Sequence, residues 1–154
     1  KEEWRLKKLV VYESIHHGNT ERIGKIVAEC LNADLIKADD VNVNILNDYD
    51  LIGFGSGIYY GKFHKNIVGL IDKLPTLSGK KAFIFSTSGQ GKNKYNNLIG
   101  QKLKEKGFEV VGSFACKGYD TFGPFKIFGG IAKGRPNNED FQNAKEFAQN
   151  LFVK

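Results

Sequence analysis

The chain has 154 residues, of which 41% are hydrophobic and 26% charged, a composition typical of a globular domain that buries its own core. The formal net charge is +6, yet the lysines are spread along the sequence, without an arginine-rich run or a known nucleic-acid motif. No apolar run is long enough to cross a membrane, and the opening residues, KEEWRLKK, contain no signal-peptide core. We therefore expect one domain over residues 1–154, with no nucleic-acid binding and no membrane insertion.

The two cysteines bear on the cellular compartment. Cys30 and Cys116 both lie in apolar, periodic segments. We expect two buried thiols rather than a disulfide or a redox pair. That pattern favours the cytoplasm.

Strand-like and helix-like segments alternate along the whole chain. Short apolar runs predict strands at 6–12, 33–38, 50–57, 81–86 and 108–116. Apolar residues at helical spacing predict helices within 23–31, 67–74, 95–103 and 141–151, whereas 39–48 is too short and polar to assign. Because continuously apolar strands are buried on both faces, the pattern predicts a doubly wound α/β fold, with a five-stranded parallel sheet and helices on both faces.

A long segment, 117–137, interrupts this alternation before the last helix. It is rich in glycine, and a connection longer than about 15 residues is usually functional or disordered. Four aromatic residues argue against disorder, because solvated linkers rarely carry so many rings. They are Tyr119, Phe122, Phe125 and Phe128. We expect a loop or insertion here, followed by a helix that Asn137 or Asn138 caps.

Polar loops follow three of the predicted strands, at the edge where open α/β sheets bind ligands. The first loop contributes seven candidate binding residues: Ser14, Ile15, His16, His17, Gly18, Asn19 and Thr20. Its hydroxyls and its glycine lie just before a helix, whose positive end favours an anion, so we interpret the loop as a phosphate site. Alternatively, Asn19 or Thr20 caps the helix and nothing more. His16 and His17 either bond to the phosphate or are plain loop residues.

Other phosphate-binding motifs fail in this sequence. Gly61-Lys62 resembles the end of a P-loop, but Ser56 stands where that motif needs its first glycine, and Phe63 follows the lysine. No GxGxxG motif follows the first strand, which argues against a dinucleotide. The first loop contains neither lysine nor arginine. The remaining interpretation is a lysine-free site for a single phosphate.

The second and third loops suit a flat ring. The second offers Ser56, Gly57, Ile58, Tyr59, Tyr60 and Gly61, and the third offers Thr87, Ser88, Gly89, Gln90 and Gly91. Adjacent tyrosines between glycines can form a stacking platform for a ring, or they can cap the hydrophobic core. Hydroxyls, an amide and glycine backbone in the third loop suit the polar edge of a heterocycle. No catalytic triad or metal cluster is apparent, so no catalytic or metal-binding residue is predicted.

These three loops make the chain resemble the flavodoxins. Gly18-Asn19-Thr20 matches the Gly-Asn-Thr hallmark of that family's phosphate loop, although the loop is one residue longer here. Tyr59 falls where the family often places an aromatic ring over the isoalloxazine. Residues 87–91 fall where the third loop meets the ring edge. The resemblance implies FMN as the cofactor and a strand order of 2-1-3-4-5.

Our first hypothesis is an FMN-binding, low-potential electron carrier that works between redox partner proteins. Many flavodoxins are acidic whereas this chain is basic, so an acidic redox partner fits by charge complementarity. In flavodoxins, the peptide that corresponds to the one between Gly57 and Ile58 can rotate to bond the reduced ring. Glycine permits that rotation at low cost.

Two alternatives remain open. Residues 57–65, GIYYGKFHK, are similar to a segment of menaquinone-dependent protoporphyrinogen oxidases, which implies a flavoenzyme whose 117–137 segment covers a substrate. An NAD(P)H-dependent quinone or FMN reductase belongs to the same alternative. The other alternative is a flavodoxin-like module that has lost its cofactor. A carrier turns over only with a protein partner, whereas an enzyme oxidises its own small-molecule donor.

Overall fold

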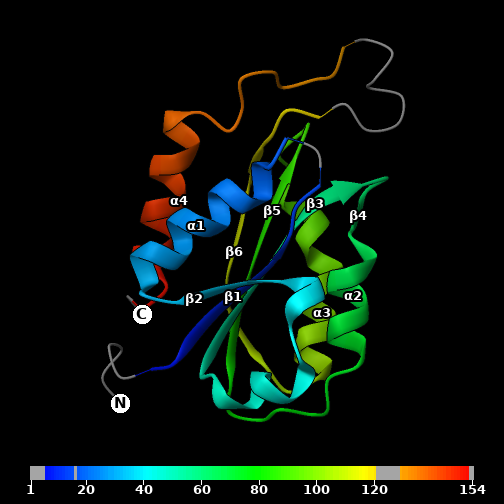
Figure 1. Ribbon diagram of the computed structural model, residues 1–154, viewed down its shortest axis with the longest axis vertical. Helices are drawn as coiled ribbons and strands as arrows, with labels where there is room; N and C mark the ends of the chain where they lie inside the picture. The colour runs from blue at the N-terminus through cyan, green and yellow to red at the C-terminus, as the bar shows by residue number, and fades with distance from the viewer. Residues whose placement is uncertain (1–5, 16, 121–128, 153–154) are drawn as a thin grey trace.

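A parallel β-sheet organises the protein (Figure 1). The structure is a computed structural model that describes residues 6–15, 17–120 and 129–152. The parallel strands are β1 (Lys8–Glu13), β2 (Asp34–Lys37), β3 (Leu51–Tyr59), β5 (Lys81–Ser88) and β6 (Glu109–Lys117). They lie in the order β2-β1-β3-β5-β6, which is the expected 2-1-3-4-5 when parallel strands are counted along the chain. The doubly wound α/β fold is therefore confirmed.

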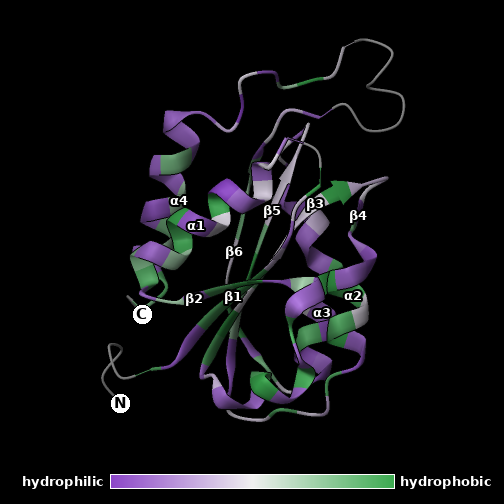
Figure 2. Cartoon of the chain, viewed as in Figure 1, coloured by the Kyte–Doolittle hydropathy of each residue, from purple (hydrophilic) through white to green (hydrophobic). Residues whose placement is uncertain are grey.

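Two helical layers enclose the sheet. One face carries α1 (Asn19–Leu31) and α4 (Asn138–Asn150), and the other carries α2 (Lys65–Asp72) and α3 (Asn97–Glu105). Ile23 of α1 packs in one hydrophobic cluster with Phe83 and Phe85, whereas Ile67 of α2 packs in a second cluster with Phe54. The helices in Figure 2 alternate between hydrophobic and hydrophilic residues, as elements with one buried face do. None of the helices in the described ranges could span a bilayer.

Two connections differ from the expectation. The segment left unassigned at 39–48 forms two short 3-10 helices, η2 (Ala38–Asp40) and η3 (Val43–Asp48), which carry the chain from β2 to β3. In addition, the chain turns back after β3 and forms an unpredicted sixth strand, β4 (Lys62–Phe63), which pairs antiparallel with the end of β3. A two-residue strand has too few side chains to produce a periodic pattern, so no strand could be predicted there.

The described parts of segment 117–137 are bonded to each other. Asp120 and Ile131 form an antiparallel bridge, with N–O distances of 2.9 and 2.8 Å. Beside the bridge, the backbone N–H of Tyr119 donates to the carbonyl of Arg135 at 2.8 Å. The remaining predicted aromatic residues of this segment, Phe122, Phe125 and Phe128, lie outside the described residues.

Asn137 caps α4, as one of the two expected residues. Its side chain accepts the backbone N–H of Asp140, and the Asp140 carboxylate accepts the backbone N–H of Asn137 in return. Arg135 also donates to both oxygens of Asp140 at 2.6 Å. Burial favours the neutral acid, but the hydrogen bonds from Arg135 and Asn137 outweigh it and hold the pKa of Asp140 below its usual value.

The two thiols differ in exposure. Cys116 on β6 is buried, and burial raises its pKa to about 12. Cys30 is exposed, so the expectation of two buried thiols is wrong for this residue. It lies in the last turn of α1, at the edge of the buried stripe that contains Ile23 and Val27. Both thiols are free.

The central strand β3 depends on two of its glycines. Each residue of β3 from Leu51 to Ile58 is buried. The rings of Phe83 and Phe85 occupy the space that a Cβ atom would take at Gly53 and Gly55, respectively. The absence of a side chain at these two positions of β3 thus lets the aromatic rings of β5 lie against the sheet.

We predict that Gly55→Ala lowers the free energy of unfolding by about 1–3 kcal/mol, because the added methyl group meets the Phe85 ring. The matched change Gly69→Ala, inside α2, has open space for the methyl group within 4 Å. It should raise stability by about 0.5–1 kcal/mol, since alanine is the better helix former. Urea unfolding measures both changes, and shifts of the same sign would contradict the packing argument.

Candidate functional site

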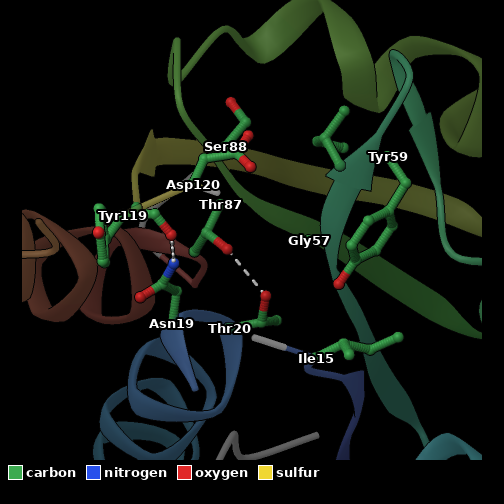
Figure 3. Close-up of a pocket in the computed structure, with 11 residues that line it drawn as sticks. Ile15, Asn19, Thr20, Gly57, Tyr59, Thr87, Ser88, Tyr119 and Asp120 are labelled. Atoms are coloured by element: carbon green, nitrogen blue, oxygen red, sulfur yellow. Dashed lines mark hydrogen bonds between the residues drawn. The ribbon is translucent and has the colours of Figure 1, made fainter. Parts of the chain in front are cut away.

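The three predicted loops meet in one pocket at the carboxyl edge of the sheet (Figure 3). Its volume is about 30 Å³. Eight of the predicted site residues line it: Ile15, Asn19, Thr20, Gly57, Ile58, Tyr59, Thr87 and Ser88. Three further residues line it that were not predicted as site residues: Gly118, Tyr119 and Asp120. The carboxyl ends of β1, β3 and β5 lie side by side, which is why loops distant in sequence converge here.

The start of α1 provides the donors of the first loop. Gly18 is the N-cap, in the left-handed conformation with φ of 65° and without a side-chain cap bond, so neither Asn19 nor Thr20 is the cap. Both belong to the first helical turn, whose backbone N–H groups have no partner within the helix. The next N–H, of Glu21, donates to Ser14 Oγ at 3.2 Å. No side chain therefore caps the start of α1, and its first two residues, Asn19 and Thr20, line the pocket.

A hydroxyl pair joins the first loop to the third. Thr20 Oγ1 and Thr87 Oγ1 lie 2.8 Å apart, and both side chains are buried. One hydroxyl donates to the other, which leaves the second hydroxyl with a proton to offer an acceptor. The pair lies between α1 and β5 in Figure 3. It is therefore suited to hold a phosphate oxygen at the helix start.

The second loop is a tight hairpin rather than an open loop. Strand β3 continues through Tyr59, and Tyr60 and Gly61 turn the chain with φ of 52° and 77° into β4. Ser56 Oγ donates to the Gly57 carbonyl and accepts the backbone N–H of His64, so this hydroxyl ties the hairpin together. Tyr60 is 76% exposed and does not line the pocket. The proposed pair of tyrosines is thus reduced to one ring beside the pocket.

The Tyr59 side chain closes the pocket over Gly57. Its hydroxyl lies 2.7 Å from the position of a Cβ atom at Gly57, and its ring meets His64 edge-on at 5.5 Å between centroids. Figure 3 shows the hydroxyl directed toward Ile15. Burial raises the pKa of Tyr59, against the opposing effect of a hydrogen bond with the backbone of Ile15. The Tyr59 side chain is therefore a neutral phenol that lies across the Gly57 side of the pocket.

Only the first half of the third loop reaches the pocket. Thr87 and Ser88 still belong to β5, whereas Gly89 packs against the Ile131 side chain and offers no open backbone. Gly91 donates its N–H to Ser88 Oγ at 2.7 Å. Gln90 accepts the hydroxyl of Tyr95 at 3.1 Å. Gly89, Gln90 and Gly91 therefore shape the loop without lining the pocket.

A basic side chain, which the first loop itself lacks, lies beside Asn19 at the start of α1. Arg22, one turn into α1, donates to the His17 carbonyl at 2.6 Å and to Asn19 Oδ1 at 2.8 Å. The amide of Asn19 in turn donates to the Tyr119 carbonyl at 2.8 Å. The His17 ring lies 4.3 Å from the Tyr119 ring. The loop sequence suggested a site without positive charge, but Arg22 places a guanidinium beside it.

The sequence held one usable signal for Arg22. Residues three apart on a helix are neighbours, so Asn19 predicts contact with position 22. Tyr119 gave no such signal, because its contact spans 100 residues. His16 lies outside the described residues, whereas His17 packs against the ring of Tyr119 and does not itself line the pocket.

Known proteins resemble this chain over nearly its whole length. A family model for the flavodoxin domain matches residues 9–123. The uncharacterized protein MJ0298 of Methanocaldococcus jannaschii is 52% identical over 148 residues, which cover 95% of this chain and 98% of that protein. The flavodoxin-like domain-containing protein BilS of Clostridioides difficile is 28% identical, with 97% and 98% covered. A solved flavodoxin from the domain Archaea has a TM-score of 0.71 at 21% identity, with 95% and 96% covered. The chain belongs to the flavodoxin domain family.

Proposed function

We propose that this flavodoxin-family protein binds FMN and carries electrons at low potential between redox proteins, one of them acidic. The observation that supports it best is the convergence of two features in one pocket. The start of α1 with the Thr20–Thr87 hydroxyl pair suits a phosphate, and the strand end at Gly57 with Tyr59 suits a flat ring. FMN has both parts in one molecule.

The phosphate end of FMN fits the donor set. Backbone N–H groups of the first turn and the Thr20 hydroxyl would hold the phosphate oxygens at the positive end of α1. The Arg22 guanidinium, held beside Asn19 and the His17 carbonyl, would lower the cost of placing a dianion there. A pyrophosphate would need a longer glycine turn than this helix start provides.

The pocket must widen before it can hold the ring of FMN. A volume of about 30 Å³ holds about one water molecule, and a small-molecule site needs roughly ten times more. The Tyr59 side chain fills the space beside Gly57. Its rotation away from Gly57 would admit the isoalloxazine, and the tyrosine ring would then stack on it.

In the carrier, the flavin supplies the redox chemistry, and the chain sets its surroundings. Gly57 has no Cβ, so the peptide that follows it can change orientation and offer a donor or an acceptor to the ring edge at low cost. The Tyr59 side chain would exclude water from a flavin held in the pocket. The two free thiols are compatible with a reducing compartment, and we assign the carrier to the cytoplasm on that basis.

A flavoenzyme is the second candidate, and one observation favours it. Residues 118–120 line the pocket, and Ile131 covers Gly89 beside it, so the late segment is placed to shape a substrate site. Steady-state assays with NAD(P)H or a porphyrinogen separate the two candidates. Turnover without a protein partner would refute the carrier, and turnover only with a partner would refute the enzyme.

We predict that Thr20→Val weakens FMN binding by about 1–3 kcal/mol, because a donor to a charged oxygen is lost. Fluorescence titration of FMN measures the dissociation constant, and unfolding without FMN shows whether the fold is intact. Thr76→Val is the matched control, since Thr76 is exposed and does not line the pocket. Equal affinities in both variants would refute the phosphate role of Thr20.

We predict that Tyr59→Ala weakens FMN binding by about 0.5–1.5 kcal/mol through loss of ring stacking. Tyr60→Ala should leave the affinity unchanged, because this neighbouring ring is 76% exposed and lies outside the pocket lining. The same titration compares the two variants. A larger loss in Tyr60→Ala would show that the wrong tyrosine has been assigned to the ring.

A further inference from the structure

The positive charge of the protein is concentrated in one part of the fold. Residues 51–104 contain nine lysines and a single acidic residue, Asp72, so this part carries +8 while the rest of the chain carries −2. It includes α2, α3 and the β3–β4 hairpin, which lie on one side of the sheet in Figure 1. Asp72 is paired with Lys102 at 2.9 Å. The opposite layer, α1 and α4, carries charges of both signs.

An apolar groove opens in the middle of this basic layer. Its volume is about 350 Å³, and we call it the basic groove. It is lined by Phe63, Val68, Tyr95 and Leu98, with Lys62 and Lys65 at its margin. Leu98 is 54% exposed, and it lies in one groove with Phe63, Val68 and Tyr95 rather than as a single exposed side chain.

Further lysines extend the charge around the basic groove. Lys94 lies with its Nζ 5.8 Å from the centroid of the Tyr95 ring, and Lys92 precedes it by two residues. Lys62, Lys65, Lys92 and Lys94 are all exposed. An apolar centre with a charged rim is the organisation of a protein–protein interface, and a rim of one sign selects a partner of the opposite sign.

The basic groove is also next to the candidate cofactor pocket. Tyr59 lines the pocket, and Gly61 and Lys62, two and three residues later in the same hairpin, line the groove. A partner seated in the groove would therefore contact the hairpin that closes the ring side of the pocket.

We propose that the basic groove docks an acidic redox protein, which exchanges electrons with the flavin across the β3–β4 hairpin. This inference rests on the proposed function and names the surface that it uses. The rim consists of lysines without arginine, and its centre is apolar; both features suit a protein partner better than nucleic acid, whose interfaces are rich in arginine and largely polar.

The test uses an acidic [2Fe–2S] ferredoxin, chemically reduced beforehand, as the probe. Stopped-flow absorbance follows flavin reduction in the FMN-loaded protein over a range of salt concentrations. The variant Lys62→Glu/Lys94→Glu changes two rim charges. The control Lys25→Glu/Lys145→Glu makes the same change of net charge at exposed positions on α1 and α4.

We expect the rim variant to lose at least about tenfold in the bimolecular rate constant at low salt, with the loss shrinking as salt screens the charges. The control variant should remain within about twofold of the parent protein, since its charges lie on the other layer. Equal losses in both variants, or no salt dependence, would overturn the proposal. Leu98→Ser should lower the rate even at high salt, because it removes apolar contact area.

A second measurement does not depend on the flavin. Carbodiimide joins lysines to carboxylates in contact, and mass spectrometry of the product with the same ferredoxin should locate the links at Lys62, Lys65, Lys92 or Lys94. Links elsewhere, links between two copies of this chain, or displacement of the ferredoxin by duplex DNA would overturn the proposal. A protein that holds no FMN but gives the expected links would refute the proposed function and leave the docking surface intact.

Discussion

Burial of β3 between β1 and β5 is the constraint on which the rest of the structure depends. The strand pairs in parallel with both neighbours, so its residues face two hydrophobic clusters and none faces water from Leu51 to Ile58. Gly53 and Gly55 leave room for the rings of β5, which brings the two strands into dense contact. Because β1, β3 and β5 all end at the carboxyl edge of the sheet, the polar segments that follow these strands lie close together there.

The parallel arrangement of the strands is the reason why the sequence alone predicted that the three loops converge. Continuous apolar runs identify parallel strands, and the parallel arrangement alone places residues 14–20 beside Thr87 without any knowledge of side-chain contacts. The cap of α4 was also predictable, since Asn137 and Asp140 have the spacing of a capping box. Local rules and strand polarity were therefore sufficient for the fold class, whereas the strand order came from the resemblance to the flavodoxins.

The other features of the fold and of the candidate site depend on contacts between residues that are distant in sequence, which local sequence rules do not predict. The hairpin at Tyr60 and Gly61 looks in sequence like a continuation of a glycine-rich loop, and only the pairing with β4 shows that β3 extends to Tyr59. Asn19 resembled a cap because capping is the commonest role of asparagine at a helix start, yet its amide contacts the Tyr119 carbonyl from the far end of the chain. Such assignments require the tertiary fold.

The bridge between Asp120 and Ile131 joins the described residues on the two sides of 121–128. The Tyr119–Arg135 hydrogen bond and the Asn137 cap hold the chain on the far side of that bridge against α4. The entropy cost of closing a loop rises by only about 0.6 kcal/mol for each doubling of its length. The Asp120–Ile131 bridge, the Asn137 cap and the Thr20–Thr87 pair are all formed by residues outside 121–128, so an exchange of 121–128 by engineering keeps these contacts available and makes this position the natural one for grafting a new specificity onto this flavodoxin-family scaffold.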